Sequence, residues 1–153
     1  MRALLIALVL VVCSFSNMLG AEAQELPVTS PFGWRIHPQT GDWRFHSGVD
    51  LGYDYGTGIA ALFDGVVVQS GDFGDGYGMQ VLLYHEGVDS FTRYGHCSII
   101  FCQSGDHVLA GDVIGAVGST GNSTGPHLHL EYIVPTASGY EYADPLELFQ
   151  QEG

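Results

Sequence analysis

The sequence predicts an all-β protein: a small antiparallel β-sheet or sandwich-like single domain with long loops. Short apolar runs rich in β-branched and aromatic residues are separated by glycine-rich and aspartate-rich turn signals. Residues 127–134 alternate between a mostly polar side and an apolar side, which is the period of a half-buried strand. No segment before the C-terminus has a helical period. A chain of 153 residues is the size of one domain.

Six strands are expected, all after residue 58, and turn chemistry separates each from the next. They cover residues 59–63, 65–69, 79–85, 90–96, 113–117 and 127–134. After the last of them, Asp144 precedes Pro145 and a short apolar tail. This order predicts one helical turn that Asp144 caps.

The N-terminal 23 residues are interpreted as a signal peptide. Arg2 precedes an apolar run over residues 3–13, and Ala21-Glu22-Ala23 has the small-residue pattern of a cleavage site. The run is too short to span a bilayer comfortably, so no transmembrane segment is expected in the mature chain. We expect an exported protein, periplasmic or extracellular. Lipid attachment at Cys13 is the less favoured alternative, because the residue before it is a bulky valine.

After the signal peptide, residues 24–30 are expected to be a short tether, and residues 31–150 to form the folded domain. The sequence is strongly acidic, with a formal net charge of −13 at pH 7, and none of its 4 basic residues is a lysine. Nucleic-acid binding requires a basic surface that neutralises phosphates. We therefore expect no nucleic-acid partner.

Removal of the leader leaves two cysteines, Cys97 and Cys102. An exported protein meets an oxidising compartment, where disulfides persist. A Cys97–Cys102 disulfide is expected if the chain turns back over residues 98–101, because bridged Cα atoms lie within about 7 Å of each other.

The strand predicted over residues 127–134 carries the strongest chemical signal. His127 and His129 lie on one strand face, about 6–7 Å apart at the backbone, so their ring nitrogens can converge on one metal ion. Glu131 shares this face, which is expected to be mostly polar and to point outward. The alternate residues, beginning with Leu128, are expected to face the core.

A second cluster contains His46 and Asp50. In a straight strand these residues would be about 13 Å apart, too far for one ion with ligand bonds near 2 Å. Gly48 lies between them and allows a bend that other residues resist. A His-x-x-x-Asp pair by itself is weak evidence for a metal site.

His96 is the third candidate, with a purely structural role as the alternative. Strand alternation places Tyr94 and His96 on one face and Cys97 on the opposite face. The remaining histidines are interpreted as residues of loops and strand ends without a catalytic role: His37, His85 and His107.

These clusters make chemical sense together. Catalytic zinc uses three protein ligands and keeps an open position for water, and imidazole and carboxylate groups can supply those ligands. The metal lowers the pKa of bound water and polarises the carbonyl that is attacked. Amide hydrolysis also needs a base and a hydrogen-bond donor for the developing oxyanion, which further histidines can provide.

The sequence resembles the lysostaphin-type (LytM-type) zinc endopeptidases of bacterial cell-wall peptidoglycan. The resemblance covers nearly the whole chain after the leader and includes three separate active-site motifs in the right order. The matching segments are residues 31–38, 46–50, 93–96, 111–121 and 125–130.

The resemblance implies that His46, Asp50 and His129 bind Zn²⁺ in a groove between loops of an antiparallel β-structure. It implies that His96 and His127 are the catalytic pair that orients water and stabilises the oxyanion, without deciding which is the base. Members of this family cleave wall peptides at D-alanyl cross-links or at glycine bridges. The resemblance therefore implies a secreted zinc metalloendopeptidase whose partner is a peptidoglycan peptide.

Cys97 departs from the family, where a leucine is expected after the catalytic histidine. A Cys–His nucleophile pair is rejected, because neighbouring strand residues face opposite ways. The alternative function is a non-catalytic peptidoglycan-binding or hydrolase-activator module on the same fold, but competent residues occupy all five site positions. A lipoyl-like carrier hairpin over residues 111–118 would need a lysine, and the chain has none.

Overall fold

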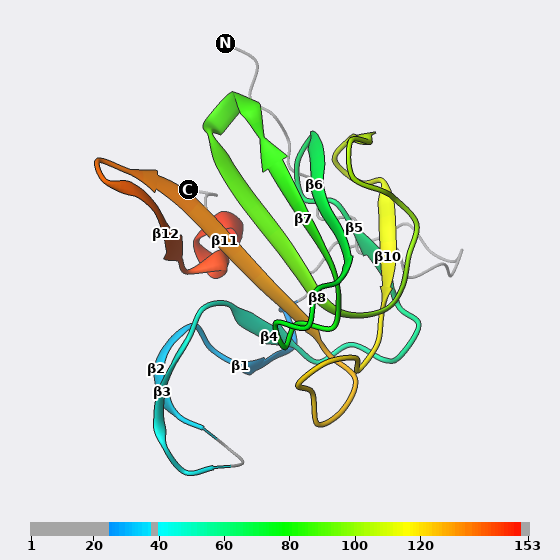
Figure 1. Cartoon of the computed structure of the whole chain (residues 1–153). Coiled ribbons are helices and arrows are strands. Elements are labelled where there is room, and N and C mark those ends of the chain that lie inside the picture. The colour runs from blue at the N-terminus through cyan, green and yellow to red at the C-terminus, as the bar shows by residue number, and fades with distance from the viewer. Residues whose placement is uncertain (1–24, 38–39, 151–153) are drawn as a thin grey trace, which may run out of the picture.

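The computed structural model describes residues 25–37 and 40–150, and it confirms the all-β prediction. Among these residues, ten strands form one sheet and two form a separate hairpin, and all the pairs of neighbouring strands are antiparallel. Figure 1 shows the hairpin β2–β3 projecting from one end of the main sheet. The predicted signal peptide and Cys13 lie outside the described residues.

The main path through the large sheet is β1-β4-β11-β8-β7-β6-β9, with β12 beside β11, and β10 between β8 and β5. The strands are β1 Val28–Ser30, β2 Gly33–Ile36, β3 Trp43–His46, β4 Val49–Leu51, β5 Gly58–Ala60, β6 Gly65–Asp72, β7 Met79–His85, β8 Ser90–Ile100, β9 His107–Val108, β10 Val113–Val117, β11 Leu128–Thr136 and β12 Gly139–Ala143.

All six predicted strands are present, although several ends differ. The other six strands were not predicted because each is only two to five residues long and several are largely exposed, so their sequences show too few apolar alternations. Residues 24–30 were predicted to be a tether, but Val28–Ser30 is strand β1 and pairs with β4. Residues 28–30 therefore belong to the sheet.

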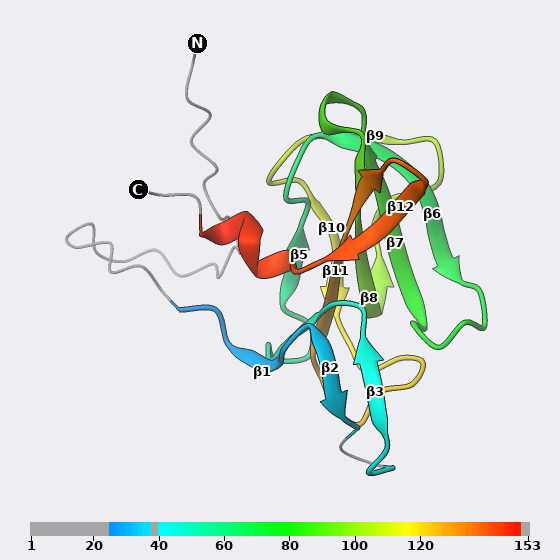
Figure 2. The same ribbon diagram turned by 90° about the vertical axis from the view of Figure 1, so that its left-hand side faces the viewer.

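The two short helices are η1 Glu86–Val88 and η2 Pro145–Phe149. The second confirms the predicted C-terminal turn, because the Asp144 carboxylate accepts a hydrogen bond from the Leu146 amide at 2.9 Å. Across residues 25–37 and 40–150, no helix is long and apolar enough to cross a membrane. Figure 2 shows η2 beside the sheet rather than within it.

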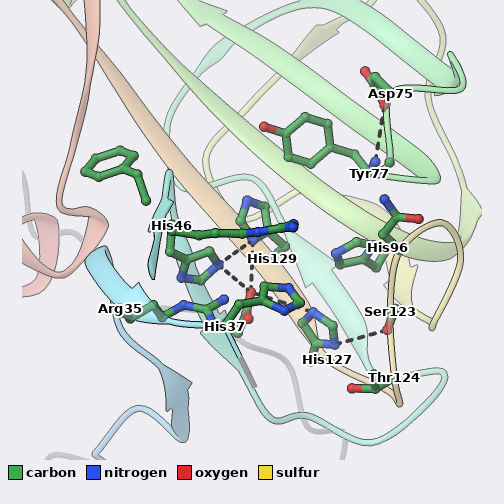
Figure 3. A pocket seen from close by; sticks show the side chains of 15 residues that line it. Arg35, His37, His46, Asp75, Tyr77, His96, Ser123, Thr124, His127 and His129 are labelled. Atoms are coloured by element: carbon green, nitrogen blue, oxygen red, sulfur yellow. Dashed lines mark hydrogen bonds and ion pairs between the residues drawn. The ribbon is translucent and has the colours of Figure 1, made fainter. Parts of the chain in front are cut away.

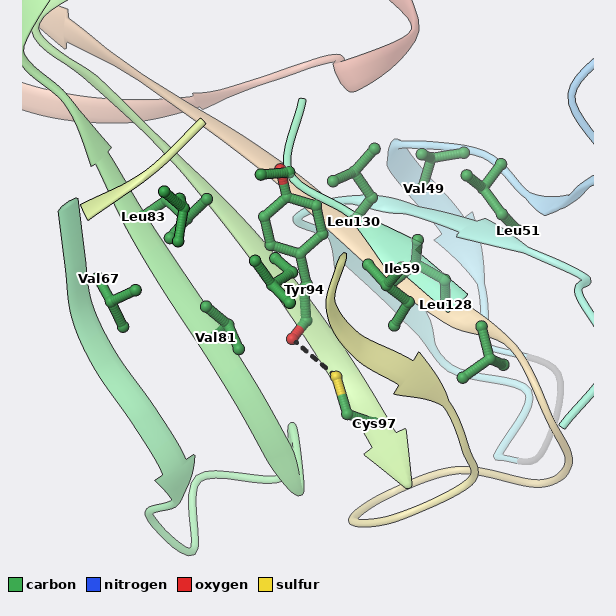
Figure 4. Packing of buried hydrophobic residues seen from close by; sticks show 14 residues of the cluster. Val49, Leu51, Ile59, Val67, Val81, Leu83, Tyr94, Cys97, Leu128 and Leu130 are labelled. Carbon is green, nitrogen blue, oxygen red and sulfur yellow. Dashed lines mark hydrogen bonds between the residues drawn. The ribbon is translucent and has the colours of Figure 1, made fainter. Parts of the chain in front are cut away.

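The core lies where the central strands β7, β8 and β11 stack their apolar side chains against β4, β5 and β10 (Figure 4). Val81, Leu83 and Tyr94 are each no more than 1% exposed. The Tyr94 hydroxyl accepts a hydrogen bond from the Leu62 amide and another, at 3.0 Å, from the Thr92 hydroxyl. This packing fixes β8, which carries one of the candidate site residues at its far end.

The predicted Cys97–Cys102 disulfide is not formed in the structure, where both residues are free thiols. The condition for it, a turn over residues 98–101, is not met, because β8 runs on through Ile100. Cys97 is fully buried in the core, and burial raises the pKa of its thiol to about 12. A thiol held in its protonated form is a poor nucleophile, which agrees with the rejection of a Cys–His pair.

Candidate active site and metal centre

His46, Asp50 and His129 converge at the end of β3, in β4 and in β11 respectively. The Asp50 Oδ1 atom lies 2.9 Å from His129 Nδ1 and 3.2 Å from His46 Nε2, and the two nitrogens are 3.2 Å apart. Among the described residues, this trio forms the one group of three or more potential metal ligands. The register explains the convergence, since His129 lies directly opposite Asp50 in the β4–β11 pair.

The bend expected at Gly48 is present and joins two different sheets. His46 ends β3 of the hairpin, whereas Asp50 belongs to β4 of the main sheet. Gly48 crosses β11 so closely that a Cβ atom would collide with the Leu130 carbonyl oxygen. The glycine is thus required for close backbone approach, in addition to the bend it permits.

His96 reaches the same site through a β-bulge that alternation could not predict. Between Met79 and Val81 of β7, the paired strand β8 advances from Cys97 to Tyr94, which is one residue more. The extra residue gives His96 a φ of 61°, and its amide donates to the Tyr77 carbonyl at 2.7 Å. Bulges commonly re-aim side chains in this way. The prediction that Tyr94 and His96 share a face is therefore wrong: Tyr94 enters the core and His96 enters the site.

His127 lies just before β11 and completes the cluster. Its ring centroid is 4.7 Å from that of His96, and its Nε2 atom is 3.6 Å from Asp50 Oδ1. Figure 3 shows the imidazoles of His46, His96, His127 and His129 directed towards one another. The structure thus brings together all five site residues expected from the sequence.

The outer nitrogen of each imidazole is held by a hydrogen bond, which fixes the tautomer of each ring. In three rings Nδ1–H donates to a backbone carbonyl: His46 to Pro31 at 2.8 Å, His96 to Thr120 at 2.7 Å and His127 to Gly125 at 2.8 Å. In His129 the donor is Nε2–H, which lies 3.1 Å from Glu131 Oε1. The inner nitrogens therefore present their lone pairs to the centre of the site.

Glu131 was not identified as a site residue from the sequence. The burial of Glu131 also shows that the predicted orientation of β11 is wrong. The face expected to point outward is buried here, with Glu131 0% exposed and His129 5% exposed. The Oε1 atom accepts hydrogen bonds from the Ser47 hydroxyl at 2.5 Å and the Tyr77 hydroxyl at 2.7 Å. Its other oxygen lies 3.4 Å from Arg93 Nε. A buried carboxylate needs such partners to remain charged.

The charged groups of the site stabilise each other. Burial raises the pKa of Asp50, but hydrogen bonds from His129 and His46 lower it by more when the inner nitrogens of these rings carry a proton in place of a metal, so this carboxyl remains ionised below the usual range. Burial opposes charge on Glu131 in the same way, but the hydrogen bond and the positive charge of protonated His129, together with hydrogen bonds from the Ser47 and Tyr77 hydroxyls, more than offset this and lower its pKa. Burial lowers the pKa of His96 to about 4, which keeps that imidazole neutral near pH 7.

The five residues lie in an open groove of about 310 Å³. One wall is the β2–β3 hairpin and includes Arg35, His37 and Arg44, and the opposite wall includes Tyr77 and the loop containing Asn122 to Thr124. His37, interpreted as a loop residue, thus lines the groove. His85 instead hydrogen-bonds to the Asp64 carbonyl and the Thr92 hydroxyl, each at 2.8 Å, and His107 is exposed, so both lie outside the site.

The fold and site together define a small antiparallel β-domain with a cluster of histidine and aspartate side chains in a groove that could hold a metal ion. The sequence model of Peptidase family M23 matches residues 44–143 of this chain. The chain belongs to Peptidase family M23.

Named relatives agree with this assignment. "DD-carboxypeptidase/endopeptidase Mpg" of Neisseria meningitidis serogroup B is 49% identical over 105 residues, covering 68% of this chain and 24% of that protein. "Peptidoglycan DD-endopeptidase ShyC" of Vibrio cholerae is 39% identical over 100 residues, covering 65% of this chain and 23% of that protein. The chain therefore spans about a quarter of the length of these curated relatives.

A solved structure shows the same fold. The catalytic domain of the antimicrobial peptidase lysostaphin from Staphylococcus simulans superposes with a TM-score of 0.71 at 31% sequence identity. The match covers 82% of this chain and 93% of the lysostaphin domain. The similarity thus extends over nearly the whole of a known peptidase domain.

Proposed function

We propose that the chain is a zinc-dependent endopeptidase that hydrolyses peptide bonds in bacterial peptidoglycan. The observation that carries this proposal is the convergence of His46, Asp50 and His129 with His96 and His127 in one groove. The names of the relatives, which include a peptidoglycan endopeptidase, support the substrate class. The family supports the reaction class.

The three ligand atoms fit a zinc ion on chemical grounds. Because His46 and His129 donate outward, their inner lone pairs and the Asp50 carboxylate face one another at 2.9–3.2 Å. Three electron-rich atoms at this spacing repel unless a cation lies among them. Two imidazoles and a carboxylate are ligands of catalytic zinc, and outer hydrogen bonds of this kind orient such ligands. Bound zinc would supply a water of lowered pKa and polarise the scissile carbonyl.

His96 and His127 would handle the protons of the reaction. Each ring donates its Nδ1–H to a backbone carbonyl, which leaves Nε2 facing the groove. A neutral Nε2 accepts a proton from the attacking water, and the protonated ring then donates to the oxyanion or to the leaving amine. The 4.7 Å separation of the rings allows both to contact one tetrahedral centre.

We further propose that the N-terminal 23 residues direct export, so that the enzyme meets its substrate in the periplasm or outside the cell. Peptidoglycan lies beyond the cytoplasmic membrane, and the charged start, apolar run and small-residue site of this segment have the features of a signal peptide. Lipid attachment at Cys13 remains the less favoured form of the same export.

Fragment analysis of purified peptidoglycan tests the proposed function. The mature chain is incubated with directly cross-linked and with glycine-bridged wall, with and without a chelator, and the released fragments are identified by mass spectrometry. We expect new fragments that disappear with chelator and return when zinc is added. No cleavage of either wall by folded, zinc-loaded protein would contradict the proposal and favour a binding or activator module.

Glu131→Gln is expected to weaken zinc binding about 10–100-fold, the usual effect of losing an outer partner of a metal ligand. The substitution keeps the side-chain shape but removes the buried carboxylate that accepts from His129 Nε2. Competition with a chromophoric chelator measures the affinity.

Glu141→Gln is the matched control, because Glu141 is exposed on β12 and the charge change is the same. Unchanged affinity in the Glu131 variant would show that this carboxylate only fills space beneath the site.

A further inference from the structure

The hairpin wall of the groove presents two arginines on the same face as the candidate ligand His46. In the β2–β3 register, Arg35 lies directly opposite Arg44, and Gly33 lies opposite His46. Alternate residues of a strand share a face, so Arg35, Arg44 and His46 point to one side. Both arginines line the groove, and Figure 3 shows Arg35 beside His37. The other face of the hairpin is aromatic, with Trp34 and Trp43 stacked at 6.5 Å.

This pairing of like charges is unfavourable for the hairpin by itself. Directly opposed residues of an antiparallel pair have Cβ atoms about 5 Å apart, and like charges there are destabilising. The chain is rich in acidic residues, with 17 in all, and an acidic residue at either position would form a favourable pair across the hairpin. Two of its 4 basic residues instead lie opposite each other here. An arrangement that weakens the free hairpin is expected where an anionic ligand binds between the charges.

Among the residues that the structure describes, Arg35 has no acidic partner. Arg93 is paired with Glu131 at 3.4 Å, and Arg44 with Asp42 at 3.5 Å in an exposed, weak contact. Within residues 25–37 and 40–150, the Arg35 guanidinium makes no hydrogen bond or ion pair. Its Nε atom is buried, so the stem of the side chain is held while the side chain lines the groove. A guanidinium whose N–H donors are not already engaged can bind a carboxylate in a bidentate manner.

We propose that Arg35, assisted by Arg44, forms a subsite for a free carboxylate of the peptide substrate. The inference rests on the proposed peptidase function and names the class of peptide that it takes. Arg35 and His46 occupy diagonal positions of the β2–β3 pair, about 7–8 Å apart at the backbone. An extended peptide advances about 3.3 Å per residue, so the bound carboxylate lies about two residues from the scissile bond. This favours cross-links whose residues carry free carboxylates over uncharged glycine bridges.

Three synthetic peptides test the subsite with the zinc-loaded mature chain. The first is a D-alanyl peptide with a free carboxylate two residues from the scissile bond, the second is its carboxamide analogue, and the third is pentaglycine. We expect kcat/KM for the acid to exceed that for the amide at least about tenfold, mainly through KM, as for loss of a charge-assisted contact. This preference runs against the net charge of −13, which repels an acidic peptide as a whole.

Arg35→Gln is expected to reduce the ratio of acid to amide kcat/KM to near one, and Arg35→Lys to restore part of it. The matched control is Ala137→Glu, which makes the same change in net charge at an exposed residue of the turn after β11, eight residues and about 26 Å from His129. The control should keep the wild-type ratio.

Two results would overturn the subsite: equal cleavage of acid and amide by the wild type, or an unchanged preference in Arg35→Gln. A third result separates the subsite from the proposed function. If no peptide is cleaved, binding of the acid and the amide is followed by the fluorescence of Trp34 and Trp43. Tighter binding of the acid that depends on Arg35 would retain the subsite and reject the peptidase activity, whereas equal binding would reject the subsite.

Discussion

His129→Ala is expected to remove both tightly bound zinc and peptidase activity. His129 Nδ1 lies 2.9 Å from the Asp50 carboxylate, compared with 3.2 Å for His46 Nε2, and His129 is only 5% exposed, so the substitution removes a buried ligand from the centre of the site. Metal catalysis contributes several kcal/mol to transition-state stabilisation, and each 1.36 kcal/mol is tenfold in rate. Turnover should therefore fall on the order of a thousandfold or more. The zinc content of the variant after gel filtration, measured by mass spectrometry of the metal, tests whether the loss of activity comes from the loss of zinc.

The control for this variant is His107→Ala, which removes an exposed imidazole on β9 outside the groove. It should keep both zinc and activity. Full zinc occupancy in His129→Ala would remove His129 from the ligand set and with it the proposed metal centre.

His127→Ala is expected to keep its zinc while kcat falls on the order of a hundredfold or more, the loss typical of a positioned acid–base or oxyanion group. The ring approaches Asp50 Oδ1 only to 3.6 Å and is held from outside by the Gly125 carbonyl, so its removal leaves the three ligands in place. Steady-state kinetics on a soluble peptide, together with zinc content, separate the two effects.

His96→Ala is the informative comparison for His127→Ala. The two rings are neighbours, and both variants keep the three metal ligands. If the two histidines act as a unit, the double variant should be little slower than the slower single variant. Near-normal turnover of His127→Ala would contradict its catalytic role, and loss of zinc would make it a ligand instead.

The sequence predicted the long central strands well, because each buries one or both faces over five or more residues and so shows a clear apolar period. Strands β7, β8, β10 and β11 all begin within one residue of their predicted starts. The short strands β1 and β9 have two or three residues each and too few alternations to be recognised. Their pairing depends on neighbours far away in the sequence.

The residues of the site were predictable because chemistry restricts their types. Imidazole and carboxylate groups marked the candidates, the resemblance to the zinc endopeptidases selected His46, Asp50, His96, His127 and His129 among them, and the structure brings all five into one groove. Their environment was not predictable. Alternation assigned Glu131 to solvent, but it is 0% exposed because Ser47 and Tyr77 come from other loops to cover it.

By itself, the sequence determined the fold class and the chemical groups of the site, because hydrophobic period and ligand type are local properties. Only the tertiary structure decided where those groups point. The bulge that turns His96 away from the face of Tyr94 arises from pairing between β7 and β8, and the facing of Arg35 and Arg44 from the register of β2 and β3. Register is fixed by contacts between segments, which no single segment encodes.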